Sequence, residues 1–148
     1  MSEQNMSSAR RLLEEVWTEG NLSRLPEVMV EDVVARPMPH TDALHGVEEY
    51  RQFIAVYQSI FLDMRFLIED QFASGDKVAT RWVSTVSGES GDALLDEDTG
   101  EPLAIDGVTI THHDADGKIV KEWAVWDTHS LLRTAAAPRI FEQLSLTV

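Results

Sequence analysis

The stretch LAIDGVTITHHDADGKIVKEWAVWD, residues 103–127, decides the fold of this 148-residue chain. The runs on either side of Asp114–Gly117 are strand-like, and the DADG sequence between them is typical of a turn that reverses the chain. We therefore predict a β-hairpin in which residues 103–114 pair with residues 118–132.

A second hairpin is predicted just before the first. The sequences MRFLIEDQFAS (residues 64–74) and KVATRWVSTVSG (residues 77–88) resemble two strands joined at the turn SGDK. A connection rich in glycine and acidic residues, GESGDALLDEDTGEP (residues 88–102), then leads to the first hairpin.

The N-terminal half of the chain has helical spacing instead. Apolar residues recur at three- and four-residue intervals in residues 7–19 and 45–61, and a short helix is predicted at residues 22–29. A strand at residues 31–40 ends at its prolines. Helices followed by hairpin-linked strands predict an α+β domain whose helices cover one face of an antiparallel sheet. We expect one domain over residues 1–148, with a peripheral tail after Ala135.

Composition narrows the classes of partner. The formal net charge of −14 opposes binding to nucleic acid or to an anionic membrane surface, because both need clustered Lys and Arg. The chain has no cysteine, no apolar run long enough to cross a bilayer and no signal-peptide pattern, so we expect cytoplasmic residence. The expected ligand is small, and neutral or apolar.

Asp127 is the first candidate for chemistry, because it follows an aromatic, strand-like run. Alternation places residues 122–129 on two faces, one with Trp123, Val125, Asp127 and His129, the other with Glu122, Ala124, Trp126 and Thr128. If the first face meets the helices, Asp127 lies in a partly dry enclosure where its pKa rises toward neutrality. Alternatively, Asp127 ends the strand and caps a helical turn at THSLL.

The histidines are the next candidates. His112 and His113 point to opposite faces of their strand, so only one of them can point into a cavity and hold an oxygen or pass a proton. His40 is predicted to lie at the mouth of that cavity. We expect no metal site, because the histidines lack ligand spacing backed by a third ligand.

Other kinds of chemistry have weaker signals. The chain has no GxSxG nucleophile motif and no phosphate-binding glycine loop, so we expect no cofactor. Aromatic residues more often belong to a core than to a binding site, but a small domain that must line a pocket would use the same residues. We predict Tyr57, Trp82 and Trp123 as the wall of such a pocket.

Several segments, taken in order, resemble the SnoaL-like polyketide cyclases of the NTF2-like superfamily. They are EVWTEGNLSRLPEVMVEDVV, LHGVEEYRQFI, SGDKVATRWVSTVSGE and DTGEPLAIDGVTITHHDADGKIVKEWAVWD. The resemblance covers about residues 8–134. It implies a cone-shaped α+β barrel, in which a curved sheet wraps around three helices and encloses a deep apolar cavity.

The resemblance also implies a reaction and its residues. Cyclases of this family close a ring by an intramolecular aldol reaction, without metal or cofactor. Their acid/base Asp falls on Asp127 here, and a family histidine falls on His113, which would bind the developing oxyanion. We therefore predict a homodimeric cyclase acting on a polyketide-like molecule. Two alternatives stay open, an epoxide-opening enzyme of the same fold and a binding domain without catalysis.

Overall fold

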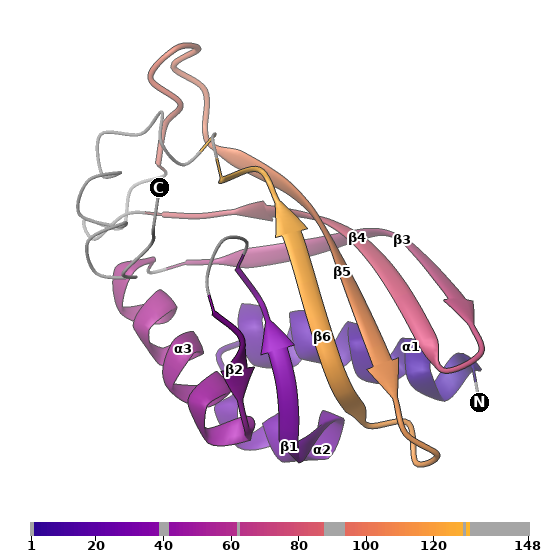
Figure 1. Ribbon diagram of the computed structural model, residues 1–148. Coiled ribbons are helices and arrows are strands. Elements are labelled where there is room, and N and C mark those ends of the chain that lie inside the picture. Colours follow the sequence, from indigo (N-terminus) through magenta and orange to yellow (C-terminus); the bar gives the residue numbers. More distant parts are fainter. Residues whose placement is uncertain (1, 39–41, 62, 88–93, 129, 131–148) are drawn as a thin grey trace.

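The computed structural model describes residues 2–38, 42–61, 63–87, 94–128 and 130, and its main element is one curved six-stranded sheet (Figure 1). The strands lie in the order β2-β1-β6-β5-β4-β3. Their bounds are Met29–Arg36 (β1), Leu44–His45 (β2), Arg65–Ser74 (β3), Lys77–Thr85 (β4), Ala104–His113 (β5) and Ile119–Trp126 (β6).

Both predicted hairpins are present and form most of the sheet. β3 pairs antiparallel with β4, β5 pairs antiparallel with β6, and β4 joins the two hairpins by pairing along β5. β1 lies parallel to β6, with β2 antiparallel on its far side. The sheet is therefore antiparallel except at the β1–β6 pair.

The helices precede or interrupt the strands in the chain and lie on the concave side of the sheet. Their bounds are Ser2–Arg11 (α1), Leu12–Thr18 (η1, a π-helix), Leu22–Arg24 (η2, a 3₁₀ turn), Leu25–Val28 (α2) and Val47–Ile60 (α3). α1 crosses beneath β3 and β4, while α3 packs against β1 and β2 at the other end (Figure 1). The first helix thus begins at Ser2, five residues earlier than the sequence pattern predicted.

The helices fill the inside of the curved sheet with apolar side chains. Leu12, Val16, Leu25, Ile54 and Ile119 are at most 1% exposed and belong to one continuous core. This arrangement confirms the predicted α+β class, with a curved sheet around N-terminal helices. Among the described residues, no helix is both long and apolar enough to cross a membrane.

Candidate active site

A cavity opens between the concave face of the sheet, η1 and α3, with a volume of about 50 Å³. Its walls are mostly apolar, and among the described residues Glu122 is the one lining residue with a carboxyl or basic side chain. The lining residues are Leu13, Trp17, Pro37, Tyr57, Phe61, Met64, Phe66, Trp82, Ser84, Val86, Ile105, Thr109, Glu122, Ala124 and Trp126.

Glu122 is held in the wall of this cavity by β6. Its side chain is on the inner face of the strand, between the buried Ile119 and Ala124, and the residue is only 3% exposed. The hydroxyl of Tyr50 donates a hydrogen bond of 2.6 Å to Glu122 Oε2. A single buried carboxyl group therefore borders an apolar hollow, where its protonation state depends on a few neighbours.

Burial raises the pKa of Glu122 from its ordinary 4.5 to about 7, because the charged form loses its hydration. The hydrogen bond from Tyr50 opposes this effect, since it stabilises the carboxylate. Tyr50 itself stays protonated, because burial and the nearby Glu122 both raise its pKa well above the ordinary value. Glu122 can thus gain or lose a proton near neutral pH, while Tyr50 remains a donor.

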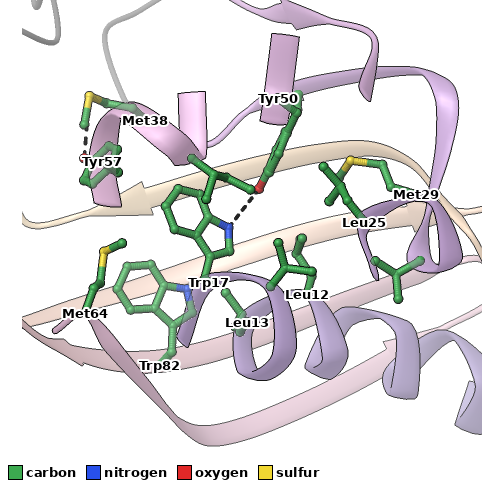
Figure 2. Packing of buried hydrophobic residues seen from close by; sticks show 14 of the residues in the cluster. Leu12, Leu13, Trp17, Leu25, Met29, Met38, Tyr50, Tyr57, Met64 and Trp82 are labelled. Carbon is green, nitrogen blue, oxygen red and sulfur yellow. Dashed lines mark hydrogen bonds between the residues drawn. The ribbon is translucent and has the colours of Figure 1, made fainter. Parts of the chain in front are cut away.

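The Tyr50 hydroxyl is oriented from the helical side of the cavity. Trp17 Nε1 donates to that hydroxyl at 3.2 Å, as Figure 2 shows with a dashed line. Trp17 comes from η1, where the Glu19 amide bonds to the Glu14 carbonyl in the wider π-helical pattern. A π-helical turn is rare and often lies at a functional site. The sequence pattern predicted an ordinary helix here and gave no sign of the wider turn.

The indole of Trp82 lies over a glycine in the neighbouring strand. Gly107 pairs with Trp82 on one side and with Trp126 on the other. A Cβ atom at Gly107 would come within 2.4 Å of the Trp82 ring and within 2.9 Å of the Trp126 Cβ. The missing side chain therefore lets two tryptophans line the same cavity, and Trp82 Nε1 donates to Thr109 Oγ1 at 2.8 Å.

Comparison with known proteins identifies the family and the fold of the chain. The family model described as SnoaL-like polyketide cyclase matches residues 7–135. The chain belongs to the SnoaL-like polyketide cyclase family. No curated protein matches the chain by sequence.

Solved structures share the fold of this SnoaL-like chain at low sequence identity. A SnoaL-like protein from Jannaschia sp. CCS1 is 21% identical, with a TM-score of 0.75 over 93% of this chain and 94% of that one. Wild-type IdmH from Streptomyces antibioticus is 24% identical, with a TM-score of 0.69 over 97% and 99% of the two chains. PrhC from Penicillium brasilianum NBRC 6234 is 16% identical, with a TM-score of 0.74 over 97% and 95%.

Of the residues predicted to form the wall of the SnoaL-like cavity, Tyr57 and Trp82 line it and Trp123 does not. Trp123 lies on the outer face of β6, is 38% exposed and stacks edge-on against His112, with ring centroids 4.9 Å apart. The prediction for Trp123 was wrong because the strand presents its other face to the helices. His40 lies outside the described residues.

Asp127 lies at the end of β6 and is exposed, so the part of the chain that the structure describes does not form the expected dry enclosure around its carboxyl group. Its Oδ1 accepts a hydrogen bond of 3.1 Å from the Ser130 amide, and its Oδ2 accepts one from the Ser130 hydroxyl. These contacts fit the alternative interpretation, in which Asp127 caps the turn after the strand. Its role as the acid/base stays a prediction.

His113 faces the inside of the sheet and is 4% exposed, whereas His112 faces outward. The His113 ring lies outside the cavity lining, with Nε2 2.8 Å from Thr111 Oγ1 and Nδ1 2.9 Å from the Gly117 carbonyl oxygen. The Asp127 amide donates a hydrogen bond to the Asp106 carbonyl, and Asp106 is roughly 23 Å along β5 from His113 at about 3.3 Å per residue. The structure therefore does not bring the two predicted catalytic residues together.

Glu122 was missed because the more apolar face of the hairpin was assigned to the interior. Val125, which is 68% exposed, and Trp123 belong to that face. One signal was available in the sequence: Lys121 and Glu122 are neighbours in a strand, so one of these two charged side chains must point inward.

Proposed function

We propose that this protein closes a ring in a neutral, polyketide-like molecule by acid/base catalysis without a cofactor, and that Glu122 moves the proton. The observation that carries the proposal is the position of Glu122, a buried carboxyl group with a pKa of about 7 in a mostly apolar cavity. A group with a pKa near the working pH is the most effective general acid or base.

The proposed step is an intramolecular aldol addition. The Glu122 carboxylate removes a proton from the carbon beside one carbonyl group of the substrate, which gives an enolate and a protonated Glu122. The enolate carbon then forms a bond to a second carbonyl carbon of the same molecule, whose oxygen becomes an alkoxide. The alkoxide takes the proton back from Glu122, so the product is an isomer of the substrate and the enzyme returns to its starting state.

Tyr50 and Trp17 set the environment of the Glu122 carboxyl group in this reaction. The Tyr50 hydroxyl stabilises the carboxylate through its hydrogen bond, and Trp17 fixes the direction of that hydroxyl. The apolar walls exclude water, which favours folding of a flexible substrate against itself over proton exchange with solvent. We propose Tyr57 and Trp82 as wall residues that contact the substrate.

The family resemblance offers Asp127 and His113 as a competing pair of catalytic residues. The Asp127 carboxylate is exposed, and both ring nitrogens of His113 are paired within its own hairpin. For these two reasons we favour Glu122. The two assignments predict that different variants lose activity, so one experiment can distinguish them.

The test follows proton removal separately from ring closure. A phenyl-substituted δ-diketone, which closes to a six-membered ring, is incubated with the protein in D₂O, and NMR follows both deuterium at the carbon beside the carbonyl and the cyclic product. Glu122→Gln keeps the size of the side chain and an acceptor for Tyr50. We expect it to slow deuterium incorporation by about 100- to 10,000-fold, the usual contribution of a general acid or base.

Asp127→Asn and His113→Gln are measured beside Glu122→Gln under the same conditions. We expect Asp127→Asn to retain most of the exchange rate. If Asp127→Asn abolishes exchange and Glu122→Gln does not, the assignment to Glu122 is wrong and the family residue is the base. If the wild-type protein binds the diketone and accelerates neither process, the binding-domain alternative replaces the enzyme.

A further inference from the structure

The cavity contains a second polar group that the proposed reaction does not use. Ser84 Oγ lines the cavity from β4, and the residue is 4% exposed. Among the described residues, it is the one buried side-chain nitrogen or oxygen atom without a hydrogen-bond partner. A buried hydroxyl without a partner costs about 1–3 kcal/mol, so its position beside a ligand cavity needs a reason.

The neighbouring hydroxyls on the same face of the sheet show how unusual Ser84 is. Thr109 accepts from Trp82 Nε1 at 2.8 Å, and Thr80 accepts from Gln71 Nε2 at 3.1 Å. Thr111 pairs with His113 at 2.8 Å. Thr109 and Tyr57 also line the cavity, but each has a partner within the protein, whereas the Ser84 hydroxyl has none among the described residues and can donate to a molecule that enters the cavity.

The charge of the cavity limits what Ser84 can bind. Among the described residues, the lining includes no Lys, Arg or His to pair with a carboxylate or phosphate of the substrate, and Glu122 would repel such a group when ionised. A hydroxyl in apolar surroundings instead matches an uncharged oxygen acceptor, such as a carbonyl, ester or ether oxygen.

Ser84 also lies away from the proposed reacting centre. Ser84 is opposite Ile105 in β5, whereas Glu122 is opposite Thr111, so the two side chains enter the cavity at different levels. The separation along β5 is at most about 20 Å at 3.3 Å per residue, and the curvature of the sheet shortens it. A substrate that meets both groups therefore contacts two different levels of the cavity.

We propose that the Ser84 hydroxyl is a substrate-positioning group that donates a hydrogen bond to an uncharged oxygen remote from the carbon deprotonated at Glu122. This inference rests on the proposed function for the identity of the reacting end. The substrate class it defines is a neutral molecule with one carbonyl group at the reacting end and a further uncharged oxygen remote from it.

The test compares a ketone with the hydrocarbon of the same shape. Calorimetric titration gives the affinities of α-tetralone and tetralin for wild type, Ser84→Ala and Ser84→Thr. The titrations are run at pH 8.5, where Glu122 is mostly ionised and does not donate to the ketone. We expect Ser84→Ala to weaken α-tetralone binding about five-fold, the worth of one net hydrogen bond, and to leave tetralin binding unchanged. Ser84→Thr, which keeps the hydroxyl, should retain the preference for the ketone.

Two controls separate this role from a structural one. Thr80→Val removes a paired hydroxyl from the same strand, so it should lower the melting temperature and leave ketone affinity unchanged. Ser84→Ala removes an unpaired hydroxyl, so the melting temperature of the unliganded protein should stay level or rise.

Three outcomes overturn the proposal. In the first, wild type and Ser84→Ala bind the ketone with equal affinity. In the second, Ser84→Ala loses as much affinity for tetralin as for the ketone. In the third, Ser84→Ala melts several degrees below wild type. If Tyr57→Phe, and not Ser84→Ala, loses the ketone preference, the donor is Tyr57 instead. None of these binding results depends on turnover, so the Ser84 proposal and the role of Glu122 fail or survive separately.

Discussion

Replacing Glu122 by Gln should make the protein more stable at high pH, which is an unusual result for a buried, hydrogen-bonded residue. The folded-state pKa of Glu122 is about 7, against an ordinary value of 4.5. Between these two values the unfolded chain releases the proton and the folded protein keeps it, so the free energy of unfolding falls as the pH rises. Below about pH 4.5 both states are protonated and this cost is absent; above about pH 7 the cost is complete.

The size of the effect follows from the same two numbers. A difference of about 2.5 pKa units, at 1.36 kcal/mol per unit, corresponds to about 3 kcal/mol between pH 4 and pH 8. Gln has no charge to bury and still accepts a hydrogen bond from Tyr50, so Glu122→Gln lacks this cost. Relative to the wild type, the variant should therefore gain about 3 kcal/mol as the pH rises across this range.

The assay is urea unfolding followed by tryptophan fluorescence, at pH values from 4.5 to 8.5, for the wild type and the variant. Subtracting the two curves cancels the titration of groups that both proteins share. Glu69→Gln, at an exposed position in β3, shows what the loss of one negative charge does to a chain of net charge −14. Tyr50→Phe should move the wild-type transition to higher pH, because the hydrogen bond that lowers the pKa of Glu122 is gone. A constant difference between wild type and Glu122→Gln from pH 4.5 to 8.5 would refute the reasoning.

Three further perturbations test other parts of the structure. Gly107→Ala should cost about 1–3 kcal/mol in urea unfolding, because the new methyl group would lie 2.4 Å from the Trp82 ring. His113→Gln should have a lower free energy of unfolding than wild type at pH 8, and the difference should shrink toward pH 5. Burial lowers the pKa of His113, so the stability that the neutral ring contributes is present above its ordinary pKa of 6.5 and is lost as the pH falls. Val125→Glu adds a charge to an exposed apolar face, so it should convert the predicted homodimer into a monomer. Light scattering after size-exclusion chromatography measures the mass. An unchanged mass in a folded variant would refute dimerisation through this face.

Much of the fold could be predicted from the sequence, because the spacing of apolar residues and the turn sequences are local features of the chain. The turn at Asp114–Gly117 and the turn before Lys77 set both hairpins, and the helix at residues 45–61 was predicted to within about two residues. The longer first helix was not predicted, because Ser7 and Ser8 are good caps in isolation and only packing decides where a helix begins. The π-helical turn was missed for a related reason, since its wider spacing is fixed by tertiary contacts.

The candidate site could be predicted only in part. Tyr57 and Trp82 were identified as wall residues because large aromatic side chains usually line pockets in small domains. Glu122 was not identified, because the decision depends on which face of β6 points inward. A shift of one residue exchanges all inward and outward side chains, and the irregular pairing between His112 and His113 is not visible in the sequence.

The polarity of the β5–β6 hairpin explains why hydrophobicity gave the wrong face. The inward positions of β5 hold Gly107, Thr109 and Thr111, while the outward positions hold Val108 and Ile110, which are 38% and 42% exposed. A sheet that encloses a cavity has room for small and polar residues inside, and here a glycine admits Trp82 and the carboxyl group of Glu122 lines the cavity. The apolar residues on the outside are not part of the core that the described residues form, so the same hairpin is the place to test both the proposed chemistry at Glu122 and the dimer at Val125.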